Sequence, residues 1–387
     1  MKSKRLENIK EFIAYNSPAI AAIIVIILLM ILPTGYEGSQ IYQGAERVPA
    51  QVLSCDDSNI IDTGLVRSGE QECTVRVLKG KFKDAETQAV NLLTGSLEQD
   101  KIFVPGDKAY IVISYSGDEI LSVTMTDHYR LDLEAVLALI FAAVLIIFAG
   151  KTGVRSVLSF ILTVLCIWKL VVPLYLKGYD PIITGGIVIV FISVMIVSLV
   201  YGFDKRALAS ALGITAGIIV TAVTGIIFTD LFKIHGAVMS YSESLLYSGY
   251  SDLNLTKIFM ASIFIGSSGA VMDVAVDITS AVAEIVKKKP DISRAEAIKS
   301  GLTIGRAAMG TITTTLLLAY SGSCIALLMV FMAQGTPVGN MLNYKYVAAE
   351  IVHTVVGSFG LVCAAPLTAV TSGLLLADNK SPETSQK

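Results

Sequence analysis

Eight apolar stretches, each close to the roughly 20 residues that cross a lipid bilayer, constrain the fold of this chain more than any other feature. They cover about residues 18–33, 133–149, 154–173, 182–201, 207–229, 256–283, 303–332 and 346–375. The 387-residue chain is 53% hydrophobic, and its mean hydropathy is +0.67, far from that of a soluble domain. We therefore predict an α-helical polytopic membrane protein with about eight transmembrane helices and a small β-rich extracytoplasmic domain after the first span.

Basic residues occur in every second connection between these stretches, and they predict the orientation of the chain. They are Lys2, Lys4, Arg5, Lys10, Lys151, Arg155, Lys205, Arg206, Lys287, Lys288, Lys289, Arg294 and Lys299. Because cytoplasmic loops carry the excess of Lys and Arg, both termini are expected in the cytoplasm. The first stretch also suits a secretory signal, but residues 31–34 give no clear cleavage site, so an uncleaved anchor is favoured.

Five segments follow from this topology. They are a cytoplasmic basic N-terminus at 1–17, a first transmembrane anchor at 18–33, an extracytoplasmic domain at 34–131, a seven-helix transmembrane domain at 132–375 and a cytoplasmic tail at 376–387. Alternating runs at 72–78, 109–114 and 120–124 predict strands in the extracytoplasmic domain, as an open barrel or a sandwich. Cys55 and Cys73 lie in this domain, where either a disulfide or two unpaired thiols is expected.

Two of the connecting loops are long enough for structure of their own. The outer loop at about 230–255 is rich in Ser, Tyr and Gly, and a short interfacial helix or a lid is expected there. The inner loop at about 285–302 contains Ser293 and Glu296, which match a helix capping box. A short cytoplasmic helix leading into the seventh stretch is expected there.

An acidic ridge runs along the sixth stretch. At about 100° per residue, one helix face carries Ser262, Gly266, Gly269, Asp273, Asp277, Ser280 and Glu284. A carboxylate at membrane depth costs at least roughly 2.5 kcal/mol, and such residues usually face a bundle interior or a water-filled path. Asp273, Asp277 and Glu284 are therefore candidates for ion or proton coupling, with Ser280 lining a path. The alternative is that Asp277, Glu284 and Arg306 lie at the cytoplasmic interface, either solvated or paired with the basic loop.

The seventh stretch carries polar residues on one side of its helical wheel: Thr303, Arg306, Gly310, Thr313, Thr314 and Ser321. Arg306 is expected at the depth of the two aspartates, and a buried Arg–Asp pair would allow both charges to be tolerated. Thr313, Thr314 and Ser321 are candidates for lining a path. The glycines at 266, 269, 310 and 357 are expected to permit close helix packing.

The eighth stretch opens with Glu350 and His353, three residues apart on one helix face. The topology places this pair at an outer mouth, where a histidine could control proton entry. Carboxylate–histidine pairs at this spacing also bind metals in some helix bundles, so metal binding is left open. His128 and His235 are predicted on the same side.

Several functions lack their sequence signatures. The chain has no Gly-x-x-x-x-Gly-Lys-Ser/Thr phosphate loop, no His-Glu-x-x-His zinc motif and no Gly-x-Ser-x-Gly nucleophile elbow. No cofactor is expected, and the net charge of −2 does not indicate nucleic-acid binding. The expected partners are the lipid bilayer, a small solute or ion, and a membrane protein or a second copy of the chain.

A family resemblance rests on the residues around the ridge. Residues 269–278 (GAVMDVAVDI), Gly305-Arg306, 309–311 (MGT), 350–352 (EIV) and 365–369 (APLTA) are similar to the signature of the YibE/F-like family of bacterial multi-pass membrane proteins. The family carries a basic residue, often Arg, near position 353, so His353 departs from the pattern. The resemblance covers most of the chain and implies a fold and a location in the bacterial cell membrane more than an activity.

Three hypotheses for function follow. The leading one is a secondary transporter or exporter coupled to protons or cations through Asp273, Asp277 and Arg306. The second is an intramembrane enzyme acting on a lipid-linked substrate, with the carboxylates holding a divalent cation. The third is a non-catalytic scaffold or partner subunit, with the acidic ridge as an assembly face.

Overall fold

The computed structural model describes residues 2–37 and 44–377, and the chain forms two compact units. A helical unit consists of the chain up to residue 34 and from residue 148 onwards, and a barrel unit consists of residues 35–147. The first helix after the barrel thus belongs mostly to the barrel unit. The predicted tail at 376–387 lies almost entirely outside the described residues.

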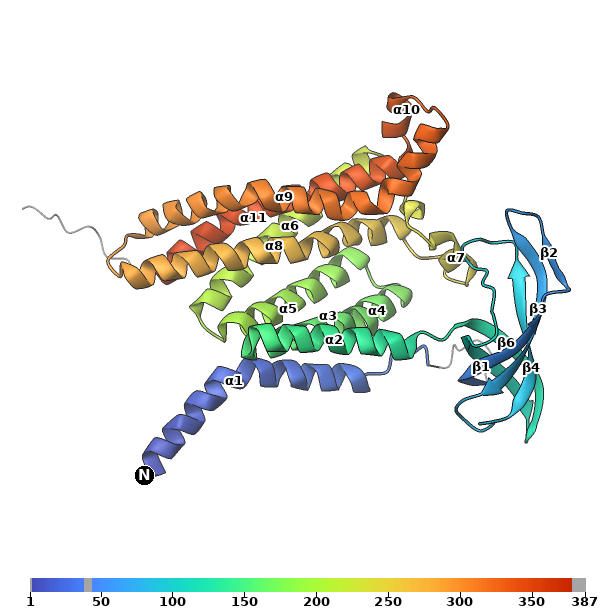
Figure 1. The fold of residues 1–387 in the computed structure, drawn as a ribbon. Coiled ribbons are helices and arrows are strands. Elements are labelled where there is room, and N and C mark those ends of the chain that lie inside the picture. The colour runs from blue at the N-terminus through green and yellow to red at the C-terminus, as the bar shows by residue number, and fades with distance from the viewer. Residues whose placement is uncertain (1, 38–43, 378–387) are drawn as a thin grey trace, which may run out of the picture. The chain divides into compact units, whose positions relative to one another are not determined.

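The barrel unit contains six strands, seen at the right of Figure 1. They are β1 (Glu46–Asp56), β2 (Ile60–Asp62), β3 (Arg67–Val77), β4 (Glu86–Thr94), β5 (Lys108–Ser116) and β6 (Glu119–His128). The strands follow the order β1-β5-β6-β4-β3, and β3 pairs again with β1, which closes the sheet. β2 adds to β3 as a short hairpin, and only β4 and β6 are parallel. This is a closed five-stranded barrel with the strand order of an OB fold.

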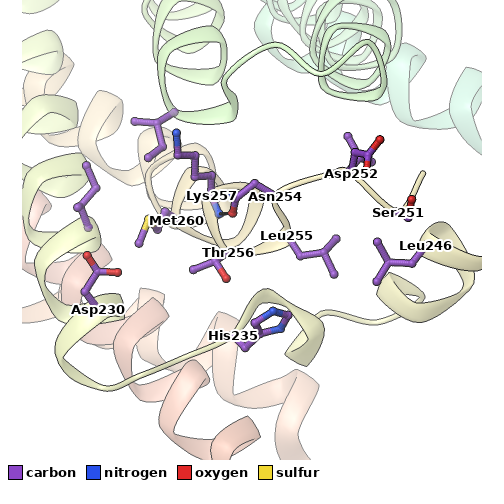
Figure 2. A pocket seen from close by; sticks show the side chains of 13 residues that line it. Asp230, His235, Leu246, Ser251, Asp252, Asn254, Leu255, Thr256, Lys257 and Met260 are labelled. Atoms are coloured by element: carbon purple, nitrogen blue, oxygen red, sulfur yellow. Dashed lines mark hydrogen bonds between the residues drawn. The ribbon is translucent and has the colours of Figure 1, made fainter. Parts of the chain in front are cut away.

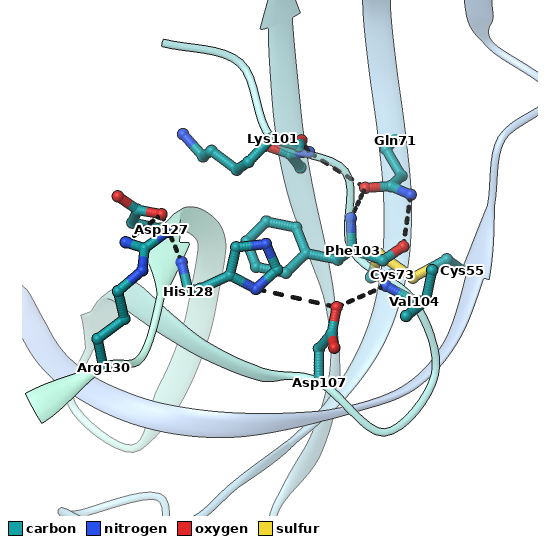
Figure 3. A network of polar contacts seen from close by, with 11 residues as sticks. Cys55, Gln71, Cys73, Lys101, Phe103, Val104, Asp107, Asp127, His128 and Arg130 are labelled. Atoms are coloured by element: carbon teal, nitrogen blue, oxygen red, sulfur yellow. Dashed lines mark hydrogen bonds and ion pairs between the residues drawn. A yellow bond between two sulfur atoms is a disulfide. The ribbon is translucent and has the colours of Figure 1, made fainter. Parts of the chain in front are cut away.

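Two buried amides brace the barrel core. Gln71 on β3 is fully buried, donates to the Phe103 carbonyl at 2.9 Å and accepts from the Phe103 amide at 3.0 Å (Figure 3). Asn91 on β4 donates to the Gln71 side-chain oxygen at 3.1 Å. Buried amide groups need such partners, because an unpaired one costs free energy. The network holds the loop between β4 and β5 against the barrel.

The two cysteines of this unit are joined. Cys55 on β1 and Cys73 on β3 are direct neighbours in the antiparallel register, and the structure links them by a disulfide (Figure 3). The bond therefore staples two strands that close the barrel. The barrel unit ends with α2 (Leu131–Ala149), a helix in which no residue is buried.

The helical unit contains the remaining helices. They are α1 (Lys2–Ile31), α3 (Lys151–Cys166), a π-helical turn η1 (Ile167–Val171), α4 (Val172–Leu176), α5 (Pro181–Tyr201), α6 (Lys205–Leu231), a 3₁₀ turn η2 (Gly236–Val238), α7 (Ser242–Tyr247), α8 (Leu255–Lys288), α9 (Arg294–Ala333), α10 (Val338–Leu342) and α11 (Lys345–Leu376). Across the described parts of both units, seven helical segments are long and apolar enough to cross a membrane, with α2 among them. The apolar part of α1, Asn16–Ile31, is shorter.

One helix, α1, is continuous from Lys2 through Pro18, so it carries both the predicted N-terminal segment and the first apolar stretch. The prediction of a separate helix in the inner loop is wrong. α8 continues to Lys288, and α9 runs unbroken from Arg294 for 40 residues, since no proline interrupts it. The predicted capping box at Ser293 and Glu296 is present and starts α9. In the outer loop, α7 provides the predicted short helix.

Close packing of α6, α8, α9 and α11 forms the core of the helical unit (Figure 1). Small residues allow these helices to approach. A Cβ atom added at Gly217 on α6 would lie only 2.7 Å from the Cβ of Ala364 on α11 and 2.9 Å from Val271 on α8. Gly305 on α9 packs against Ile278 on α8 and Ala365 on α11. This packing fixes α8 between its neighbours and determines which of its faces stays open.

Candidate functional site

The helix that carries the acidic ridge is well defined at both ends. Asn254 caps α8 by accepting a hydrogen bond from the Lys257 amide at 2.9 Å, and Lys287 and Lys288 lie in the last turn. The Asn254 side chain suits the start of the helix because it accepts from a free backbone amide. The two lysines suit its end because cations stabilise the carboxyl terminus. Over its 34 residues α8 buries Ile263, Phe264, Ile278 and their neighbours, and leaves the ridge on the opposite face.

Asp273 and Asp277 are exposed at the surface of the helical unit and open into one groove. The groove has a volume of about 440 Å³ and lies between α8 and α9. Its lining is otherwise apolar or small: Ala270, Val276, Ile312, Thr315, Leu316 and Ala319. Among the described residues that line this groove, the two carboxylates are the charged groups.

The lower part of the ridge has a different environment. The Ser280 hydroxyl lies 2.7 Å from the hydroxyl of Tyr201 at the end of α5, and Tyr201 also donates to the Val276 carbonyl at 2.6 Å. Glu284 is exposed and lies 3.5 Å from Lys288, one turn further along α8. Ser280 thus helps to fix α5 against α8, and Glu284 lies near the end of α8 beside basic residues.

The structure does not bring Arg306 to the aspartates. Arg306 is exposed, and within the described chain no ion pair joins it to Asp273 or Asp277. Thr315 lines the groove, and Arg306 precedes it by nine residues in α9. Nine residues correspond to about 900°, or about two and a half helical turns, so Arg306 lies on the side of α9 opposite Thr315. The neighbouring Gly305 packs against Ile278, next to Asp277, but Arg306 lies on the side of α9 away from the groove.

The hydroxyls predicted to line a path satisfy their own helix. Thr313 donates to the Met309 carbonyl at 2.7 Å, Thr314 to the Gly310 carbonyl at 3.1 Å and Ser321 to the Leu318 carbonyl at 3.3 Å. Such bonds are usual for Ser and Thr inside helices. The hydroxyl in the groove belongs to Thr315, a member of the same threonine run.

Glu350 and His353 lie at a meeting point of three helices rather than at an open mouth. Both are half-buried on α11. The His353 ring packs edge-on against Tyr320 of α9, with ring centroids 4.6 Å apart, and its Nε2 atom lies 3.5 Å from the Ser262 hydroxyl of α8. Ser262 and Tyr320 thus contact His353, a residue that the sequence analysis identifies, although both are distant from it in the chain.

The four predicted packing glycines divide into two groups. Gly357 lies against Ser267, and Gly266 lies against Tyr320 and His353, so both allow contact within the chain. At Gly269 and Gly310, by contrast, an added Cβ would meet no atom of the described chain within 4 Å. Packing within this chain therefore does not explain these two glycines.

A second cavity, of about 670 Å³, lies where α5, α6 and the start of α8 meet (Figure 2). Asp230, His235, Asp252 and Lys257 contribute its titratable groups, and Ser251, Asn254 and Thr256 add neutral polar side chains. Lys257 also pairs with Asp180 at 2.5 Å, and this contact holds the pKa of the Asp180 carboxyl below its ordinary value. The sequence interpretation overlooked the Asp180–Lys257 pair, although the Asp-Pro start of α5 is a recognisable cap signal.

Metal ligands do not gather in the described residues. No group of three or more His, Cys, Asp or Glu side chains there could hold a metal ion. In the part of the chain that the structure describes, Glu350 and His353 gain no third ligand of this kind, and His128 belongs to the barrel unit, where it faces Asp107 at 3.8 Å (Figure 3).

The fold and the groove together define a class: a protein of many long apolar helices with a small β-barrel unit and a pair of carboxylates midway along one helix. The chain belongs to the YibE/F-like family, whose model matches residues 137–378. The match covers most of α2 and all of α3 to α11, with the groove and the three-helix meeting point, and leaves out α1 and the six strands. No protein of curated function and no solved structure matches the chain.

Proposed function

We propose that this protein spans the bacterial cell membrane with α1 and the seven longer apolar helices, and that both of its termini lie in the cytoplasm. Support comes from the large apolar side chains exposed along these helices, which water would not solvate well. The basic residues support the orientation: Lys151 begins α3, Lys205 begins α6, and Lys287 and Lys288 end α8. The barrel unit would then lie outside the cell.

In this membrane we propose a secondary transporter or exporter coupled to protons or another cation. One observation carries the proposal: Asp273 and Asp277 open into the same apolar groove, midway along an apolar helix. An ionised carboxylate is costly at membrane depth, and binding of a proton or a cation removes that cost. The two aspartates would thus couple the binding of a cation to a rearrangement of α8 against α9.

Arg306 has a conditional role in this proposal. It lies at the depth of Asp277 but on the far side of α9 from the groove. Arg306 would pair with an aspartate only after α9 rotates or after another chain approaches. Thr315 replaces Thr313 and Thr314 as the groove hydroxyl, while Glu350 and His353 belong to the outer part of the same helix interface.

The experiment is a measurement of proton and cation flux in sealed proteoliposomes under an imposed gradient. The Asp273→Asn/Asp277→Asn variant is expected to lose the flux of the wild type. Glu284→Gln is the matched control, because it removes a carboxylate of the same ridge outside the groove, and it should retain the flux. Equal flux in the wild type and the double variant would reject the assignment.

Product formation from a lipid-linked substrate with Mg²⁺ would instead support the enzyme hypothesis.

A scaffold or partner subunit is the second candidate, and a specific observation favours it. The groove aspartates and Gly269 and Gly310 are all open at the surface of the helical unit, where small residues commonly allow another transmembrane helix to approach. In this case the acidic ridge would be an assembly face. A stable complex isolated from membranes, with no effect of Asp273→Asn on any flux, would favour the scaffold over the transporter.

A further inference from the structure

The cavity of about 670 Å³ lies at one end of three helices of the helical unit (Figure 2). At this end α5 begins, α6 ends and α8 begins. In the proposed orientation the end faces the outside of the cell, because Lys205 begins α6 and Lys288 ends α8. The volume falls within the roughly 300–1,000 Å³ that is typical of small-molecule sites.

Several contacts hold the walls of this cavity in place. Asp180 at the start of α5 pairs with Lys257 of α8 at 2.5 Å, so the two helices are tied together at the cavity. Gly236 of η2 lies directly on the backbone of α8, where an added Cβ would overlap the Leu255 carbonyl. Its amide also donates to the Thr256 hydroxyl at 3.2 Å. The cavity is therefore formed before any ligand arrives, which lowers the cost of binding.

The charge balance of the cavity is negative. Asp230 ends α6, Asp252 precedes α8, and Figure 2 shows these two carboxylates at opposite sides of the cavity. Among the described residues no ion pair engages either of them, whereas the Lys257 ammonium is already paired with Asp180. His235 uses Nδ1 to accept from the Ala237 amide at 3.1 Å, so this nitrogen carries no hydrogen. A cationic ligand would therefore complement the cavity.

Much of the remaining lining is apolar, and it indicates what kind of cation fits. Ile182 of α5, Ile226 of α6, Leu246 of α7 and Met260 of α8 all face the cavity. A metal ion would leave these side chains unused, and in the described chain no group of three or more His, Cys, Asp or Glu side chains could hold one. An organic cation can use both parts of the lining, because its nitrogen donates to carboxylates while its apolar body leaves water.

We propose that this cavity binds a small organic ammonium ion, with its charged nitrogen facing Asp230 and Asp252 and its apolar body on Ile226 and Met260. The inference rests on the proposed transport function and names the class of solute: the ammonium ion is the molecule that is carried, and it occupies this cavity on the outer side. The site is distinct from the groove of the coupling aspartates. Met260 lines the cavity and Ala270 lines the groove, ten residues or about 15 Å apart along α8.

The test is isothermal titration calorimetry of the full-length protein in lipid nanodiscs, with phenethylammonium as the probe. The uncharged comparison is 2-phenylethanol, which has the same ring and chain but a hydroxyl in place of the ammonium group. We expect saturable binding of phenethylammonium and on the order of 10-fold weaker binding of the alcohol. Asp230→Asn and Asp252→Asn should each weaken phenethylammonium binding on the order of 10-fold, because each removes one charged acceptor.

Glu243→Gln is the matched control, because Glu243 is an exposed acid of α7 in the same loop but does not line the cavity. It should bind phenethylammonium as the wild type does. An equal loss of affinity in all three variants would assign the effect to general surface charge and overturn the site. Equal affinity for the alcohol, or no saturable binding of phenethylammonium to the wild type, would also overturn it.

A flux measurement on the same preparations separates this site from the proposed function. Flux that depends on Asp273 and Asp277, without binding of phenethylammonium, would reject the cavity site and keep the transporter. Saturable binding that Asp230→Asn and Asp252→Asn weaken, without proton or cation flux in proteoliposomes, would keep the cavity site and reject the transporter.

Discussion

Individual glycines distinguish the packed interior of the helical unit from its open surface. Gly217 lies where α6, α8 and α11 converge, and an added Cβ would clash with Ala364 and Val271. Gly310 lies on the exposed face of α9, where an added Cβ would meet nothing in the described chain. The same residue type therefore has opposite consequences at two positions inside helices.

Alanine substitutions at these two glycines should give opposite results. Gly217→Ala is expected to destabilise the protein by about 1–3 kcal/mol, the usual cost of overpacking a core. Gly310→Ala should be neutral or stabilising by up to about 1 kcal/mol, because it removes a glycine from a helix interior. Thermal unfolding in detergent would compare them. A loss of stability for Gly310→Ala in the isolated chain would contradict the open surface at this position.

Asp180 combines a helix cap with an ion pair, and two substitutions separate them. It accepts from the Ile182 amide at 3.0 Å at the start of α5 and pairs with Lys257. Asp180→Ala should cost about 1 kcal/mol for the cap and up to about 1 kcal/mol more for the pair. Asp180→Asn keeps a good capping side chain and should lose only the ion-pair part.

The pH dependence of Asp180 has a defined sign. Because the folded protein lowers the pKa of this carboxyl, its contribution is complete above the unfolded pKa, about 3.9, and is lost as pH falls through the folded value. The stability difference between the wild type and Asp180→Asn should therefore shrink at acidic pH. A difference that stays constant from pH 7 to pH 3 would show that the ion pair contributes nothing.

At the scale of elements, the pairing of strands β1 and β3 closes the barrel. The disulfide between Cys55 and Cys73 closes a loop of 18 residues, which in the chain-entropy picture stabilises by about 3 kcal/mol. Replacing both cysteines by Ala should make the barrel unit unfold or be cleaved by protease at lower temperature. The helical unit is a separate compact unit, so its unfolding should be unaffected. A simultaneous loss of both units would contradict this independence.

Several elements could be predicted from the sequence, and others could not. Strands β3, β5 and β6 were identified by their alternation, but β1 contains Pro49, and β4 contains the buried Asn91, so neither has a clean apolar pattern. The helical wheel placed Asp273 and Asp277 on one face correctly. It could not place Arg306, because a wheel gives depth and direction on one helix but not the helix that lies beside it. The contact of His353 with Tyr320 could not be predicted for the same reason, because it depends on the packing of α9 against α11.

At the scale of the whole molecule, the orientation of the chain gives a direct prediction. A cysteine introduced at Leu65, which is 76% exposed in the barrel unit, should react with a membrane-impermeant thiol reagent in intact cells. A cysteine at Lys288, at the end of α8, should react only after the cells are permeabilised. Both experiments need Cys166, Cys324 and Cys363 replaced, because these are free thiols. The reverse pattern would contradict the proposed topology.

The central claim is that Asp273 takes up and releases a proton from the groove between α8 and α9. The most direct measurement is equilibrium infrared spectroscopy of the protein in vesicles across a pH series, comparing the wild type with Asp273→Asn. The account predicts a protonated-carboxyl band that grows as pH falls and is missing from the variant. A wild-type spectrum identical to that of Asp273→Asn at every pH would contradict it.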